Sequence, residues 1–339
     1  MKKLFTFLIS AVMVLDANAQ QRPHYSQYIL NNYIVNPALT GIENYTDVKI
    51  SGRDQWVGIS GAPKTAYFSI HGPIGKKDLK TTATSFQVPG ENPRGNAYWQ
   101  NYAASESHHG LGFIAVNDRT GLISTFTASV NYAYHLGLSP TVNLSAGFAG
   151  GIGKISYDRS KATPNVVDDP ALGSGNTVFT KVRPDLNAGL WLYSADFFIG
   201  LSAQQIIPHD LNFTNAPGPE NKLVPHYFGT AGYRLLLGDD INALPSVMLK
   251  YITASAEKVQ LDLNLKFQYA DLLWVGGSFR FKEGYAGMVG LNIVNKFNLG
   301  YAYDHTTTGL NRFNKGTHEL MIGFLLGNRY GDTCPRNIW

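Results

Sequence analysis

Alternation of apolar and polar residues with a period of two constrains the fold of this chain more than any other feature. The clearest example is segment 261–269, where five apolar side chains alternate with Asp, Asn, Lys and Gln. Successive side chains of a β-strand point to opposite faces, so this pattern predicts a strand with one apolar and one polar face. Segment 126–136 repeats the pattern, and neither segment has the i, i+3 spacing of a helix.

The same pattern predicts fourteen strands and no substantial helix. Two architectures accommodate so many alternating strands: a soluble sandwich or barrel, and an antiparallel transmembrane barrel of the outer membrane. Strands of about 10 residues favour the membrane, because soluble strands average about 5–6, and an even number suits closure. The predicted strands are 47–57, 65–73, 110–118, 122–136, 141–156, 182–193, 196–206, 226–237, 246–254, 259–269, 272–281, 285–294, 296–304 and 317–326.

The two faces of these strands differ as a lumen and a lipid-facing wall would. The polar faces hold Asn, Thr, Ser and Gly with scattered charges, as a lumen requires. The apolar faces carry aromatic residues near strand ends, which is typical of the girdles of membrane barrels. The charges on the polar faces are Arg53, Arg234, Asp262, Lys266 and Arg280. The aromatic residues are Trp56, Tyr134, Tyr251, Tyr269, Trp274, Tyr285 and Tyr303.

Composition agrees with a lipid-facing surface. Only 15% of the 339 residues are charged, against about 25% in soluble domains, and charge on a lipid-facing wall costs about 2–4 kcal/mol at the midplane. The net charge of +4 is spread along the chain without a basic stripe, so no nucleic-acid partner is expected. The single cysteine, Cys334, excludes a disulfide scaffold.

Residues 1–19 have the pattern of a secretory signal peptide. Lys2 and Lys3 precede an apolar stretch, and Ala17 and Ala19 form a small-residue cleavage site. The alternative, a membrane anchor, is disfavoured because the apolar stretch is too short to span a bilayer. We therefore expect cleavage near Ala19 and a multi-pass barrel in the bacterial outer membrane, surrounded by its lipid.

Loop lengths indicate an orientation. If both ends of the mature chain are periplasmic, the long loops 157–181, 207–225 and 305–316 face outside, while most of the opposite turns are short. One polar connection, 75–110, is long on the periplasmic side. Either the strand parity is wrong there, or this loop is an insertion, a plug or a docking element. Residues 328–339 form a C-terminal tail after the barrel, which spans 47–327.

Motifs that resemble catalytic or ligand sites are better explained as structure. Segment 58–65 approaches a phosphate-binding loop, but Pro63 replaces the glycine whose N–H would meet phosphate. His108 and His109 are adjacent and would point in opposite directions, as exposed loop histidines. Asp168 and Asp169 lack the spacing of a calcium loop. No catalytic constellation is recognisable, so we predict a protein that is not an enzyme and has no cofactor and no metal.

The N-terminal quarter carries the most distinctive motifs. They are Gln27-Tyr28, Asn32, Asn36-Pro37-Ala38 with Gly41, Arg53-Asp54-Gln55-Trp56 and Gly61-Ala62-Pro63-Lys64-Thr65. Further motifs are Gly110–Phe113, Asn117–Gly121, Tyr132–Tyr134, Leu144–Gly147 and, near the C-terminus, Cys334-Pro335. Together they resemble the PorP/SprF family of outer-membrane proteins, which belongs to the type IX secretion and gliding motility systems of Bacteroidota.

The resemblance implies a barrel that works with the type IX secretion machinery. Some members are parts of the apparatus, and others pair with a secreted adhesin, help to export it and hold its C-terminal domain at the cell surface. The family connects its second and third strands briefly, so 75–110 would be an insertion. The function expected is therefore adhesin or machinery binding. The alternative is a passive porin or a transporter of small solutes, with the polar strand faces lining the pathway.

The N-terminal motifs also have a direct structural interpretation. Residues 20–46 do not alternate, and Asn36-Pro37 to Gly41 indicates turns, so this segment is periplasmic or folded into the lumen. Parity places Arg53 inward, where a guanidinium needs acceptors. Arg53 and Gln55 are thus predicted as lumenal network residues, with direct partner contact as the alternative. Gly61 to Pro63 indicates a tight outer turn.

Overall fold

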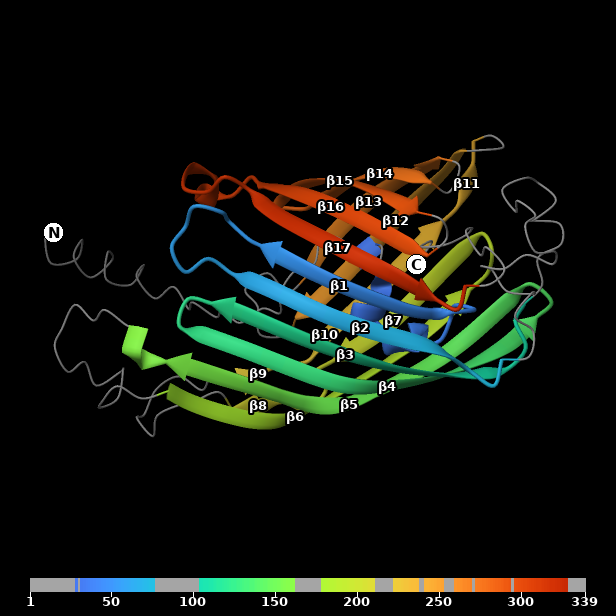
Figure 1. Cartoon of the computed structure of the whole chain (residues 1–339), viewed down its shortest axis with the longest axis horizontal. Helices are drawn as coiled ribbons and strands as arrows, with labels where there is room; N and C mark the ends of the chain where they lie inside the picture. Colours follow the sequence, from blue (N-terminus) through green and yellow to red (C-terminus); the bar gives the residue numbers. More distant parts are fainter. Residues whose placement is uncertain are drawn as a thin grey trace, which may run out of the picture.

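A computed structural model describes residues 28–29, 31–76, 104–161, 178–210, 222–237, 241–252, 259–269, 272–293 and 296–328. These residues form a closed antiparallel barrel of fourteen strands, which confirms the predicted fold class (Figure 1). Each strand pairs with its neighbour in the chain, and the first pairs with the last through Thr46 to Asp54 opposite Leu326 to His318. Closure leaves no open sheet edge in the wall.

The barrel strands lie close to their predicted positions. They are β1 (Thr46–Asp54), β2 (Lys64–Ile74), β3 (His108–Thr120), β4 (Ile123–Ser139), β5 (Val142–Asp158), β6 (Val178–Tyr193), β7 (Phe197–Gln204), β10 (His226–Tyr233), β12 (Ile241–Ile252), β13 (Val259–Tyr269), β14 (Leu273–Arg280), β15 (Gly284–Ile293), β16 (Phe297–Thr306) and β17 (Thr317–Leu326). The short β11 (Leu235–Leu236) extends the pairing of β12, and β8 (His209–Asp210) pairs with β9 (Lys222–Leu223) in a separate ribbon.

The largest difference from the predicted boundaries is at β12. This strand begins at Ile241, not at 246, and Pro245 lies inside it opposite Leu265. A proline lacks the N–H of a strand ladder and usually marks a strand end, which weakens the local pattern. The predicted strand 226–237 is divided in two: β10 ends at Tyr233, and strand pairing resumes after Arg234 in β11.

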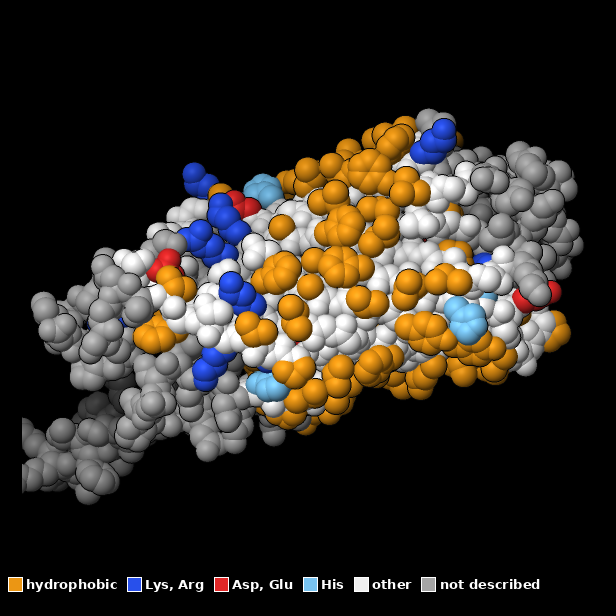
Figure 2. Space-filling view, turned by 60° about the horizontal axis from the view of Figure 1, so that its bottom comes forward, with side chains coloured by type: hydrophobic (Ala, Val, Ile, Leu, Met, Phe, Trp, Pro, Cys, Tyr) orange, Lys and Arg blue, Asp and Glu red, His pale blue; other side chains and the backbone are white. Residues whose placement is uncertain are grey.

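Exposure alternates along the strands, with polar side chains inward and apolar ones outward. In β15 every second residue is buried from Gly284 onward. The outward apolar side chains form a band around the wall, which Figure 2 shows on one face. Tyr134, Tyr251, Tyr269, Tyr285 and Tyr303 are exposed on the outer surface. No helix of the described residues is long and apolar enough to cross a membrane.

Trp274 corrects the predicted aromatic set. Its side chain is only 3% exposed and points into the barrel. In β14 it shares parity with Ser278 and Arg280, whose side chains are also buried, and not with the outward Val275 and Phe279. The parity of the strand was therefore a better guide than the aromatic character of the residue.

The barrel has two distinct ends. We call the end where β1 begins and β17 ends the terminal end, and the opposite end the loop end. The connections 55–63, 121–122, 281–283 and 307–316 lie at the loop end. β5, β7 and β12 also end there, and β6, β10 and β13 begin there. The long connection from β2 to β3 leaves and returns at the terminal end, so the strand parity holds there. Residues 77–103 of that connection lie outside the described residues.

Candidate functional site: the occupied lumen

The residues before β1 lie inside the ring of strands. We call residues 28–29 and 31–45 the lumenal segment; every one of them is buried. The segment folds into two short 3-10 turns, η2 (Asn32–Ile34) and η3 (Pro37–Leu39). Asn36 caps η3 by accepting a hydrogen bond from the N–H of Ala38 at 2.9 Å, and Pro37 suits the first position of a turn because its missing N–H is not needed there. The Asn-Pro motif thus nucleates the turn.

Strands β5, β6 and β7 satisfy the backbone of this segment on one side. An irregular buried segment has carbonyl groups that no ladder satisfies, and leaving them unpaired is costly. Ser145 donates to the Ala38 carbonyl at 2.6 Å, and Ser202 donates to the Val35 carbonyl at 2.8 Å. In the reverse direction, the Asn36 amide donates to the carbonyls of Leu190 and Leu201 at 3.0 and 3.2 Å. The wall and the segment are therefore complementary.

Three buried histidines hold the segment near the terminal end. His71 Nδ1 accepts from the N–H of Gly41 at 3.1 Å, His135 Nε2 bonds the Thr40 carbonyl at 2.8 Å, and His108 Nε2 bonds the Gly41 carbonyl at 3.2 Å. The rings of His108 and His135 are stacked with centroids 4.5 Å apart. These contacts fix Thr40 and Gly41 between β2, β3 and β4.

His108 corrects one sequence interpretation. His108 and His109 do point in opposite directions, but only His109 is exposed, where it contacts Tyr132 at 2.7 Å. His108 is 1% exposed because β3 begins at His108, two residues before the predicted start. The extra residues of the strand bring its side chain into the lumen.

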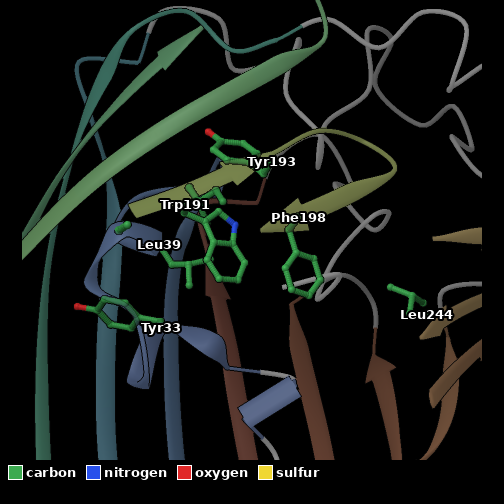
Figure 3. Close-up of a cluster of buried hydrophobic side chains, with 8 residues drawn as sticks. Tyr33, Leu39, Trp191, Tyr193, Phe198 and Leu244 are labelled. Carbon is green, nitrogen blue, oxygen red and sulfur yellow. The ribbon is translucent and has the colours of Figure 1, made fainter. Parts of the chain in front are cut away.

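Apolar contacts fill the space between the segment and the wall. Figure 3 shows Tyr33 and Leu39 of the segment beside Trp191 of β6, with Phe198 of β7 on the other side of the indole. The Trp191 and Phe198 rings stack with centroids 4.9 Å apart. A second cluster joins Tyr28, Ile29 and Val35 to Met248 of β12 and to residues of β14 to β17 on the far side of the barrel, namely Trp274, Met288, Ala302 and Met321. The segment therefore touches opposite sides of the barrel.

Glycines of the wall make room for this close approach. A Cβ atom on Gly147 would collide with the backbone of Pro37 and Ala38, and one on Gly110 with the Thr40 carbonyl. Likewise, a Cβ on Gly189 would collide with the Asn36 side chain. On the segment, Gly41 has φ +77°, a conformation that favours glycine. These glycines therefore allow the segment to pack directly against the backbone of the wall.

A chain of buried ion pairs lies in the lumen at the loop end. Arg53 of β1 donates to Glu319 of β17 at 3.0 Å and to Asp304 of β16 at 2.8 Å. Arg280 of β14 donates to the same Asp304 oxygen at 3.0 Å, and its Nε lies 3.7 Å from Asp262. Arg53 and Glu319 are direct partners across the seam between the first and last strands. Acidic and basic side chains alternate along this chain of ion pairs, from Asp262 to Glu319, and the pair of Arg53 with Glu319 joins the first strand to the last.

The remaining predicted residues lie at the turn from β1 to β2 or outside the described residues. The Gln55 N–H donates to the Pro63 carbonyl at 2.9 Å, and Gln55 is half-buried at the rim, beyond the ion-pair chain. Trp56 has φ 52° and donates its N–H to Thr317. The Gly61 carbonyl accepts from the N–H of Gly121 at 2.8 Å. Cys334 and Pro335 lie outside the described residues.

Several residues of the site had no signal of their own in the sequence. Glu319, Asp304, His135 and Trp191 sit in alternating strands, where strand parity gives only their inward direction. What each inward residue would meet depends on the closed barrel. In the described part of the chain, no group of three or more His, Cys, Asp or Glu side chains could hold a metal ion.

These features define a class: a lipid-embedded barrel whose lumen is occupied by its own N-terminal segment. The family model for the type IX secretion system membrane protein PorP/SprF matches residues 17–324. The chain therefore belongs to the PorP/SprF family, as the sequence motifs predicted, and it is an outer-membrane barrel of the type IX secretion system.

Similarity to individual proteins is much weaker. No curated protein matches the chain significantly. Among solved structures, Omp33 of Acinetobacter baumannii is 11% identical with a TM-score of 0.46, covering 85% of this chain and 100% of that chain. The toluene transporter TbuX of Ralstonia pickettii is also 11% identical with a TM-score of 0.46, covering 87% and 92%. The CymD monoaromatic hydrocarbon channel is 9% identical with a TM-score of 0.46, covering 88% and 93%. Similarity at this level carries no argument about function.

Proposed function

We propose that this barrel binds the C-terminal domain of a secreted adhesin at its loop end, and so supports export of the adhesin and its attachment to the cell surface. Membership in a family of secretion-system membrane proteins supports a role beside the machinery. The observation that carries the proposal is the occupied lumen. The lumenal segment contacts opposite sides of the wall and so obstructs a solute pathway through the barrel. This favours binding of a protein at the loop end over transport of a solute.

The loop end offers two kinds of contact for a protein partner. The turn η6 (Gly309–Arg312) lies in the predicted outer loop 305–316, where Leu310 is 39% exposed and Phe313 is 72% exposed. The ribbon of β8 and β9 pairs only with itself among the described residues, and such an edge can accept a strand from a partner. Residues 162–177 and 211–221, in the other two predicted outer loops, lie outside the described residues.

Replacing Leu310 and Phe313 together by serine tests this docking surface. Exposed apolar anchors at the centre of an interface contribute about 1–2 kcal/mol each, so we expect at least about tenfold less adhesin retained on cells and more in the medium. The measurement is the surface-bound and released adhesin in cells that carry each variant. The matched control replaces Leu138 and Leu272, exposed at the terminal end, by serine. Retention equal to the unmodified protein would contradict docking at η6.

The domain order of the exported chain is part of the proposal. Residues 1–19 act as a signal peptide, 20–46 as the segment that enters the lumen, 47–327 as the barrel and 328–339 as a tail. Cleavage after Ala19 leaves Gln20 as the first residue of the mature protein. N-terminal sequencing of the protein from outer membranes should therefore begin at Gln20, and a chain that retains Met1 would refute the assignment.

A further inference from the structure

The outer wall carries a cationic patch at the loop end, next to the apolar band. The strand registers align one outward row across β1 to β6, and this row consists of Asp54, Lys64, Arg119, Ser124, Ser156 and Thr180. The row below it is Gly52, Ala66, Asn117, Phe126, Lys154 and Val182. Figure 2 shows Lys and Arg side chains gathered along this end of the band.

The change from polar to apolar is abrupt. The next outward row is Ile50, Phe68, Ala115, Ala128, Ile152 and Pro184, and the one after it is Val48, Ile70, Phe113, Val130, Gly150 and Leu186. Neither of these rows contains a charged or hydrogen-bonding side chain. Because charge is costly in hydrocarbon, the boundary between the rows marks the level at which acyl chains meet headgroups. The cations therefore lie at headgroup level.

The cations of this patch are not balanced within the described residues. Lys64 lies directly opposite Arg119 in the ladder, and like charges in such positions repel. Asp54 compensates Lys64 at 3.2 Å, in an exposed pair. Arg119 and Lys154 are exposed and make no ion pair with any described carboxylate. A bound anion would relieve this excess of positive charge.

We propose that this patch binds the phosphorylated sugar headgroup of an outer-leaflet glycolipid. The Arg119 guanidinium can bond two oxygens of a phosphate, and the Lys154 ammonium supplies a second charge. The hydroxyls of Ser156 and Thr180, which bond each other at 3.1 Å, and the amide of Asn117 suit the hydroxyls of a sugar. The acyl chains would then cover the apolar rows below. The proposal rests on the loop end facing the cell exterior, and does not depend on which protein docks there.

Native mass spectrometry of the detergent-purified full-length barrel tests the proposal. The probes are diphosphorylated lipid A, its dephosphorylated form and phosphatidylglycerol. We expect the unmodified protein to bind diphosphorylated lipid A preferentially, and the R119Q/K154Q variant to bind it at least about tenfold more weakly. Both side chains are exposed, so the variant should keep the fold, which its heat-dependent mobility on gels verifies.

The matched control is K282Q/K315Q, which removes two exposed charges of the same end away from the patch. We expect its affinity to equal that of the unmodified protein. The proposal is overturned if R119Q/K154Q retains full affinity, if the control loses as much, or if dephosphorylated lipid A binds equally well. Equal binding of phosphatidylglycerol would overturn the assignment to a glycolipid.

Discussion

Removing the lumenal segment should convert a barrel that conducts little into an open channel. In the proposed variant, a Gly/Ser linker of equal length replaces residues 31–42, which lie in the lumen between opposite sides of the wall. The strands and their closure are untouched, and wall groups such as Ser145, Ser202 and His135 would be hydrated in the absence of their partners. We expect steady single-channel currents in planar bilayers from this variant and only rare openings from the unmodified protein.

A single substitution in the wall tests the same packing of the lumenal segment without altering the segment itself. In Gly147→Ala the new Cβ collides with Pro37 and Ala38, and overpacking of this kind costs about 1–3 kcal/mol. That cost corresponds to a rise of about five- to 150-fold in the population of molecules whose lumenal segment has left its site on the wall. Gly150→Ala is the matched control on the same strand, because its Cβ would lie 3.8 Å from the nearest atoms.

These currents also separate the proposed function from a passive porin. If the protein is a passive porin, the unmodified barrel should already conduct, and Gly147→Ala should change its current little. If the linker variant conducts no better than the unmodified barrel, the lumenal segment is not what closes the pathway. If the unmodified barrel already conducts steadily, docking of an adhesin loses its main support.

Arg53→Met should destabilise the barrel by about 3–5 kcal/mol. The substitution removes the guanidinium that pairs with Glu319, which is 1% exposed, and with Asp304. Breaking a buried ion pair on one side is costly because the other charge stays buried without its compensating partner. The measurement is the free energy of unfolding in urea of the barrel in lipid vesicles, followed by tryptophan fluorescence.

Two further variants make this test specific. Arg53→Met with Glu319→Gln should lose less stability than the sum of the two single variants, because the second change removes the stranded charge. Lys64→Met breaks the exposed pair with Asp54, whose side chains are 69% and 45% exposed, and should cost at most about 1 kcal/mol. Equal losses for Arg53→Met and Lys64→Met would show that the buried chain of ion pairs contributes nothing particular.

Local patterns in the sequence were sufficient for the wall. Alternation placed fourteen strands within a few residues of their observed bounds, except around Pro245, and it gave the inward direction of Arg53. The errors had local causes: Trp274 was assigned by its aromatic ring against the parity of its strand, and His108 lay just before a strand predicted too short. Side-chain direction repeats every two residues, so a short window contains it.

The position of the lumenal segment inside the barrel could not be predicted from local patterns. The motif from Asn36 to Gly41 indicated turns, but a turn has no periodicity that tells whether it lies outside the barrel or within it. Its partners come from strands remote in the chain, as the Ser202 bond to Val35 across 167 residues shows. The sequence contains Gly110 and Gly147, but only the closed barrel shows which backbone atoms of the lumenal segment pack against each of them.

The sequence by itself therefore determined the barrel, its two faces and, through the motifs from Gln27 to Thr65, the family. Only the tertiary structure decided what fills the lumen and which charges join its seam. Arg53 and Glu319 are 266 residues apart and become neighbours because β1 closes on β17. Strand faces follow from covalent geometry and hydrophobicity, which act between adjacent residues. Partners across a lumen follow from closure, which brings together residues that no local pattern relates.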